Sequence, residues 1–115
     1  MKSYTDLEQS KRLAEFLPLK SANMGWNVFI DGTTRILPID DWDLVKDGSG
    51  NVKFHPAWSL AALMNVLDRG ALFITPQGWA CQSYINFKAI TSDYYSNPID
   101  ACYEIILKLN ELNLL

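Results

Sequence analysis

The chain has 115 residues, a mass of 13.0 kDa and a formal net charge of −3. Hydrophobic residues make up 49% of it and charged residues 20%, which is typical of a globular domain and excludes a disordered, collagenous or coiled-coil chain. A chain of this length has room for one domain, residues 1–115, with a core that needs neither disulfides nor a metal. The acidic balance argues against a nucleic-acid binder, because recognition of phosphates needs a basic face.

No targeting or membrane segment stands out in the sequence. The first residues, Met1–Asp6, are polar, and the longest aliphatic run, Leu60–Met64, is far shorter than the roughly 18 residues that a membrane-spanning helix needs. We therefore expect a cytoplasmic protein that does not contact a membrane. Gly48-Ser49-Gly50 lacks the lysine of a phosphate-binding loop, and we expect no cofactor.

A helix is predicted near the N-terminus. Thr5 and Glu8 have the spacing of a capping box, and Pro18 ends the helical pattern. Its apolar side chains form only a modest stripe, so we expect this helix to lie on the outside of the domain.

Short antiparallel strands are predicted next. Apolar and polar residues alternate over residues 26–30 and 33–37, which favours two strands. Asp31-Gly32 between them is typical of a hairpin with a type I′ turn. Two further strands are expected at residues 42–45 and 51–54.

A central helix is predicted between Pro56 and Gly70. Proline is favoured at the first helical position, and glycine suits the left-handed residue that follows a helix. The apolar residues of this segment are Trp58, Leu60, Ala62, Leu63, Met64, Val66 and Leu67. A helix that is apolar most of the way round is buried, so we expect residues 56–69 to be the most buried element.

A further hairpin and a closing helix are predicted in the last part of the chain. Residues 71–75 and 78–87 form the hairpin, with Cys81 and Phe87 on its buried face, and residues 89–96 form a polar connection. Asn97-Pro98 starts the last helix, whose buried stripe is Cys102, Ile105, Ile106, Leu109 and Leu112. The elements together predict an α+β fold, in which antiparallel β hairpins pack on a buried central helix, with N- and C-terminal helices.

The two cysteines, Cys81 and Cys102, are too few for a disulfide framework and lack the spacing of a redox or zinc motif. A single bridge between them remains open. We favour two buried thiols, because a free cysteine behaves as a small hydrophobic residue.

His55 is the only histidine, so any chemistry that needs an imidazole depends on it. Beside Cys81 or an aspartate such as Asp43 it would be a general base, the pattern of a small hydrolase or transferase. At the junction of a strand and a helix it would instead bond to the backbone. We favour this second interpretation, because Cys81 lies in a predicted strand and no nucleophile motif is present. The protein is therefore predicted not to be an enzyme.

An acidic run of four aspartates raises the question of a cation site: Asp40, Asp41, Asp43 and Asp47. A calcium loop that began at Asp41 would need an oxygen ligand where Val45 stands. One that began at Asp47 would need glutamate at its twelfth position, where Trp58 stands. One histidine and two separated cysteines do not match a zinc site either. We expect solvated acids and no metal.

Four tryptophans are a generous supply for a chain of this size. Trp26, Trp58 and Trp79 fit core packing through their strand alternation or helical face. Trp42 stands among aspartates and is the candidate for an exposed recognition aromatic, with Asp40, Asp41 and Asp43 as its acidic surroundings on a sheet edge. In the other interpretation the chain bends there and folds Trp42 back onto the core.

Two segments resemble a pattern in short uncharacterised proteins of phages, prophages and gut bacteria. HPAWSLAAL, residues 55–63, resembles a "PAWSLAAL" helix, and NPIDACYEII, residues 97–106, resembles an "NPxDA" closing helix. The resemblance covers about a third of the chain. It implies a phage or mobile-element origin and an intracellular setting, and it carries no activity, cofactor or catalytic residue.

These observations together predict a non-catalytic accessory module that binds another protein or associates with itself as a homodimer. An acidic surface with an aromatic among aspartates suits a basic patch on a partner. Binding of a sugar or another small ligand on the tryptophans is one alternative, and a small hydrolase or transferase that uses His55 is another.

Overall fold

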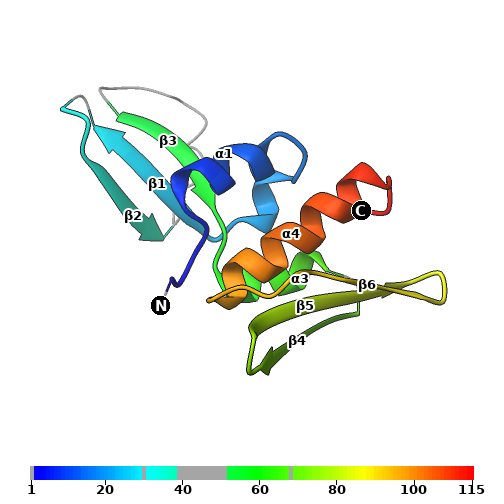
Figure 1. Cartoon of the computed structure of the whole chain (residues 1–115). Coiled ribbons are helices and arrows are strands. Elements are labelled where there is room, and N and C mark those ends of the chain that lie inside the picture. Colours follow the sequence, from blue (N-terminus) through cyan, green and yellow to red (C-terminus); the bar gives the residue numbers. More distant parts are fainter. Residues whose placement is uncertain (1, 30, 39–51, 68) are drawn as a thin grey trace.

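Two three-stranded antiparallel sheets and three α-helices form the part of the chain that the computed structural model describes, namely residues 2–29, 31–38, 52–67 and 69–115 (Figure 1). The helices are α1 (Leu7–Ala14), α3 (Leu60–Val66) and α4 (Pro98–Glu111), and a short 3-10 turn, η1 (Leu19–Ser21), follows α1. The strands are β1 (Met24–Phe29), β2 (Thr34–Pro38), β3 (Val52–Ala57), β4 (Gly70–Thr75), β5 (Gly78–Ile85) and β6 (Lys88–Thr91). The predicted α+β class, with helices near both ends of the chain, is confirmed.

The capping box of α1 lies one residue later than predicted. Asp6 is the N-cap: its Oδ1 accepts a 2.8 Å hydrogen bond from the backbone N–H of Gln9, and the Gln9 side chain accepts one from the N–H of Asp6. Thr5 is instead fully buried, and its Oγ1 accepts a hydrogen bond from the N–H of Trp58. Because the Thr5 hydroxyl forms this tertiary hydrogen bond, the next residue, Asp6, caps the helix.

The hairpin of β1 and β2 is confirmed, but its predicted type I′ turn is wrong. Val28 pairs with Thr34, so the connection is longer than two residues. Gly32 has a φ of 87°. The Asp31 carboxylate accepts a 3.0 Å hydrogen bond from the N–H of Thr33, and this local bond sets the turn.

β3 completes the first sheet on the other side of β1, where His55 stands opposite Trp26. The strand predicted at residues 42–45 lies outside the described residues. The central helix begins later than predicted, because Pro56 belongs to β3 and Ser59 is the N-cap, with its hydroxyl accepting from the N–H of Ala62.

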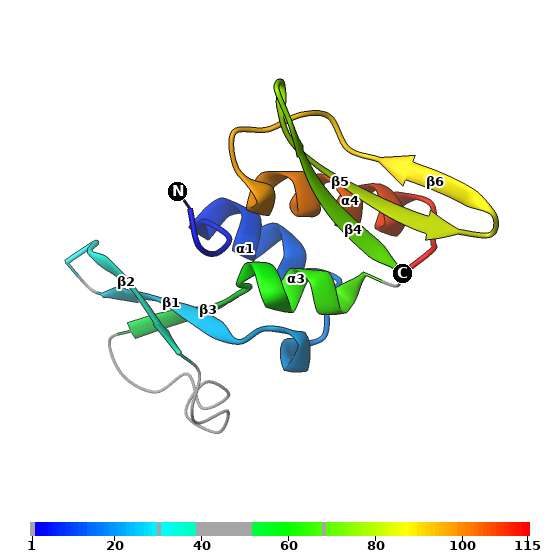
Figure 2. The same ribbon diagram turned by 90° about the horizontal axis from the view of Figure 1, so that it is seen from below.

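The core lies among the three helices and the inner face of the second sheet, so the helices stand between the two sheets (Figures 1 and 2). α4 rather than α3 is the most buried helix, which corrects the prediction for residues 56–69. α3 supplies two buried residues, Ala62 and Leu63. α4 supplies seven, namely Pro98, Ile99, Ala101, Cys102, Ile105, Ile106 and Leu109. The reason is topological: α4 packs on β5 and on α3 at once.

The second sheet has the strand order β4-β5-β6. The predicted hairpin of β4 and β5 is confirmed, with Thr75 opposite Gly78. The predicted polar connection at residues 89–96 is wrong over its first part, because Lys88–Thr91 forms β6 and pairs with β5. The chain turns back at Asn86 and Phe87, so Phe87 ends the strand pattern instead of extending it inward.

Candidate functional site

The turn between β5 and β6 is the most unusual local feature of the described chain. Ile85 pairs with Lys88, so only Asn86 and Phe87 connect the strands. Both have positive φ, 52° and 64°, as a type I′ turn requires. Asparagine tolerates this conformation, but the second position favours glycine, and a bulky side chain there is strained. Phe87 therefore occupies a position whose positive φ favours glycine.

Phe87 is also the most exposed large hydrophobic side chain of the described residues, at 91%. Two properties that cost stability thus meet in one residue: left-handed backbone strain of about 1–3 kcal/mol and an aromatic ring left in water. At 91% exposure the ring has almost no packing against the described residues that could offset either cost. Residues held in such a conformation cluster at sites of function.

The second sheet and the segment after it carry most of the exposed apolar side chains. The exposed large hydrophobic residues of the described chain are Ile74, Tyr84, Phe87, Tyr94, Leu112 and Leu115, and the first four belong to this region. Lys88 is the only charged residue between Gly70 and Ser92. Ile74 pairs with Trp79, and Tyr84 lies five residues further along β5, so Ile74 and Tyr84 are on opposite faces of the sheet and do not form one patch. Phe87 is the most exposed of these side chains, and low charge around an exposed aromatic is typical of the centre of an interface.

α4 holds the base of the β5–β6 hairpin. The ammonium group of Lys108 donates a 3.3 Å hydrogen bond to the carbonyl of Thr91, and Glu104 accepts a 2.6 Å bond from the N–H of Asp93. Burial, and then the charge of Glu104, raises the pKa of Tyr95 and keeps its phenol neutral. The turn end of the hairpin extends past the helices in both views (Figures 1 and 2). Phe87 therefore lies at the end of a hairpin whose base is fixed to α4 by hydrogen bonds.

The inner face of β5 brings the two cysteines together. Both are free and fully buried, as predicted, and their Sγ atoms lie 3.5 Å apart. Cys102 donates its S–H to Cys81. This bond lowers the pKa of Cys81 against the opposing effect of burial, and it raises the pKa of Cys102, with burial adding to the increase. The prediction that Cys81 points inward is confirmed.

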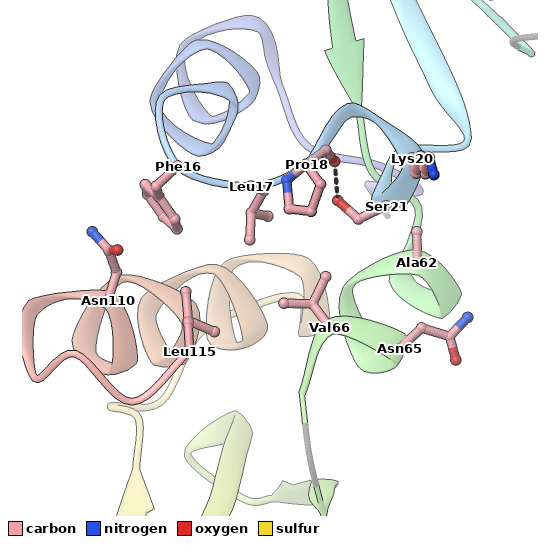
Figure 3. A pocket seen from close by; sticks show the side chains of 10 residues that line it. All are labelled: Phe16, Leu17, Pro18, Lys20, Ser21, Ala62, Asn65, Val66, Asn110 and Leu115. Atoms are coloured by element: carbon pink, nitrogen blue, oxygen red, sulfur yellow. Dashed lines mark hydrogen bonds between the residues drawn. The ribbon is translucent and has the colours of Figure 1, made fainter.

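A groove of about 620 Å³ lies between the segment after α1, α3 and the end of the chain (Figure 3). Its lining residues are Phe16, Leu17, Pro18, Lys20, Ser21, Ala62, Asn65, Val66, Asn110 and Leu115. The hydroxyl of Ser21 donates to the carbonyl of Pro18 and accepts from the indole N–H of Trp58, which fixes this wall. The groove combines apolar walls with a few polar groups, as small-ligand sites do, and contains no tryptophan.

The sequence candidates lie far apart in the fold or outside its described part. His55 lies in β3 and Cys81 in β5, so the two belong to different sheets. The carboxylate named as the other partner of His55, Asp43, lies outside the described residues. So do Trp42 and the acids beside it, Asp40 and Asp41, and the proposed recognition edge there stays a prediction.

Phe87 is the residue that sequence reasoning missed, because the alternation of β5 was continued two residues too far. The signal that could have found it is Asn86, since asparagine is common where the backbone becomes left-handed. A two-residue turn at Asn86 and Phe87 also explains why a further strand follows directly from Lys88.

Within residues 2–29, 31–38, 52–67 and 69–115, no group of three or more histidine, cysteine or acidic side chains is arranged to hold a metal ion. The helices of the same ranges are all too short or too polar to span a membrane. Comparison of the chain with protein-family models, with curated proteins and with solved structures gave no match.

Proposed function

We propose that this protein is a non-catalytic binding module that contacts a partner protein through Phe87 at the turn of the β5–β6 hairpin. The observation that carries the proposal is the combination of positive φ and 91% exposure at one phenylalanine. Selection for stability alone would replace this residue, whereas an aromatic anchor on a rigid support is what a binding surface requires.

The partner is a protein with an apolar pocket that has acidic groups at its rim. The ring of Phe87 would fill the pocket, and the ammonium group of Lys88, the next residue, would meet the rim. Lys88 is the only charged residue between Gly70 and Ser92, so the three strands themselves bring no other charge that binding would have to desolvate. The resemblance to phage and prophage proteins favours a cytoplasmic partner from a phage or its host.

The absence of catalysis is part of this proposal. Its support is that Cys81 is fully buried against Cys102 and lies in a different sheet from His55. A thiol-directed activity probe distinguishes the two classes of function, because a catalytic thiolate reacts rapidly at neutral pH. Rapid labelling of Cys81 that disappears in His55→Ala would contradict the proposal.

The experiment begins by placing a photo-crosslinking phenylalanine analogue at position 87, and separately at Leu112 as an exposed control. A protein that is crosslinked by the analogue at position 87 but not at position 112 is then purified. Its affinity for the wild type, Phe87→Ala and Leu112→Ala is measured. Loss of an aromatic anchor that contributes about 2 kcal/mol to the binding free energy weakens binding about 30-fold. We expect this loss for Phe87→Ala and an unchanged affinity for Leu112→Ala.

Three outcomes contradict the proposal. The first is that position 87 captures nothing that position 112 does not also capture. The second is a purified partner that binds Phe87→Ala within about twofold of the wild type. The third is a wild-type dimer in sedimentation that Phe87→Ala dissociates, since the partner would then be a second copy of this chain.

The groove in Figure 3 supports a second candidate function, which is binding of a small amphipathic ligand. Its volume of about 620 Å³ lies within the range of ligand sites. Lys20 would attract an anionic group while Leu17 and Val66 contact an apolar body. Short-chain fatty acids are suitable probes: saturable binding that Val66→Trp abolishes supports this function, and no binding at millimolar concentrations contradicts it.

A further inference from the structure

Cys81 and Cys102 are placed for a bond that neither residue forms in the structure. Cys81 lies on β5 and Cys102 on α4, and their Sγ atoms are 3.5 Å apart in the core. A disulfide would bring these atoms about 1.5 Å closer, to the usual S–S length. We propose that the contact of β5 with α4 is a redox modification site, where a peroxide converts the two thiols into a reversible disulfide.

The surroundings of the pair favour an intramolecular bond. Ser92 forms hydrogen bonds with both backbone groups of Cys81. Its hydroxyl accepts from the N–H of Cys81, and its N–H donates to the carbonyl of Cys81. Cys102 lies in the first turns of α4, which the side chain of Asn97 caps. Both thiols are therefore presented by fixed backbone, and burial keeps thiols of other molecules away from them.

The hydrogen bond between the thiols assigns the order of the reaction. Cys102 is the donor and keeps its proton, so Cys81 is the sulfur that loses its proton first. The Sδ of Met64 lies 3.6 Å from the Cys102 sulfur and is an alternative acceptor for the same single proton, so both contacts place Cys102 as the thiol that donates. Cys81 is thus the attacking sulfur and Cys102 the resolving one.

The chemistry takes place in two steps. The Cys81 thiolate attacks one oxygen of hydrogen peroxide, the O–O bond breaks, and the leaving hydroxide takes up a proton to become water. The Cys102 sulfur then attacks the sulfur of the Cys81 sulfenic acid, the S–O bond breaks, and the second hydroxide leaves with the Cys102 proton as water. Two thiols lose two electrons, and one peroxide is reduced to two waters. Peroxide is small enough to reach the core through local opening of the fold.

The bond would close a loop that contains the second part of β5, its turn and all of β6. Cross-linking residues that are 21 positions apart removes chain entropy from the unfolded state, and we expect the melting temperature to rise by about 10 °C. The proposal does not depend on what Phe87 binds, because its readouts are mass and stability.

The test uses the reduced wild-type protein, treated in its native state with a small excess of hydrogen peroxide. We expect a mass loss of about 2 Da, a peptide that joins Cys81 to Cys102, and a rise in melting temperature that dithiothreitol reverses. In Cys102→Ser, whose hydroxyl can still donate to the Cys81 sulfur, Cys81 should accumulate as a sulfenic acid that dimedone traps once the protein is unfolded in urea. In Cys81→Ala, Cys102 should not be trapped.

Native wild-type protein that keeps two free thiols, while urea-unfolded protein forms the disulfide under the same treatment, overturns the proposal. Disulfide-linked dimers in place of the internal bond overturn it as well. Either result is obtained on the wild type, so the proposal stays falsifiable if a cysteine variant does not fold.

Discussion

The ammonium group of Lys2 lies 2.7 Å from a carboxylate oxygen of Asp100 and joins the start of the chain to the start of α4. Gln9 on α1 donates its side-chain N–H to the same oxygen at 2.7 Å. Asn97 donates to the other oxygen at 2.8 Å. Burial acts to raise the pKa of Asp100, but these hydrogen bonds together hold it below its usual value. One carboxylate therefore ties the N-terminal segment and α1 to α4.

Asp100→Asn should lower the free energy of unfolding by about 1–2 kcal/mol at neutral pH, because the charge-assisted bonds are lost. The folded pKa is lower than the unfolded one, so this stabilisation is present above the usual pKa of 3.8 and is lost as pH falls through the folded value. Urea unfolding at pH 7 and about pH 2 should show a difference between wild type and variant that disappears in acid. Asp93→Asn, at an exposed carboxylate, is the control and should not change stability.

Phe87→Gly should be more stable than Phe87→Ala by about 1 kcal/mol, because glycine adopts positive φ without strain and alanine does not. Both variants remove an exposed ring, so the difference between them isolates the backbone. Thermal unfolding of the two variants measures it. Equal stability would mean that the turn is not strained, and the main support for a functional Phe87 would be lost.

Leu109→Ala should cost about 2–5 kcal/mol, as truncation of a buried leucine does. Leu112→Ala, three residues further along the chain, should cost less than about 0.5 kcal/mol. Leu109 is 1% exposed and Leu112 is 57% exposed, although the sequence pattern placed both in one buried stripe. Chemical denaturation of the pair checks the placement of α4, and similar losses for both variants would show that its end packs differently.

Gly78→Ala should destabilise the second sheet more than Gly32→Ala destabilises the first. Gly78 has a φ of +131°, and a Cβ there would lie 2.5 Å from the carbonyl oxygen of Tyr95. Gly32 has a φ of +87°, and among the described residues no atom lies within 4 Å of a Cβ built there, so its variant has backbone strain as the main cost. We expect losses of about 3 kcal/mol and about 1 kcal/mol respectively, read from thermal unfolding. A Gly78→Ala loss no larger than that of Gly32→Ala would contradict the contact with Tyr95.

The elements that depend on local chemistry were predicted well. Asn97 caps α4 as expected, because an asparagine before proline needs no distant partner to begin a helix. The hairpin of β4 and β5 follows from alternation on both sides of a turn that contains Pro76 and Gly78. The inward position of Cys81 follows from the same alternation.

Predictions failed where a distant partner decided between two local solutions. Thr5 and Asp6 are both good N-caps, and the backbone of Trp58 decided the choice by binding the Thr5 hydroxyl. Pro56 is a good first helical residue and also fits an edge strand of the described sheet, and pairing with β1 placed it in β3.

The sequence by itself determined the α+β class, the helix near each end, the strand periods and the burial of both cysteines, because these depend on spacing within about ten residues. Only the tertiary structure decided which helix is most buried, that the thiols of Cys81 and Cys102 lie in contact, and that Phe87 is exposed at a turn. The physical reason is that a period of two or of 3.6 defines a face but does not say what covers it, nor at which residue the period stops. Packing of α4 on β5, and the return of the chain at Asn86, supply that information.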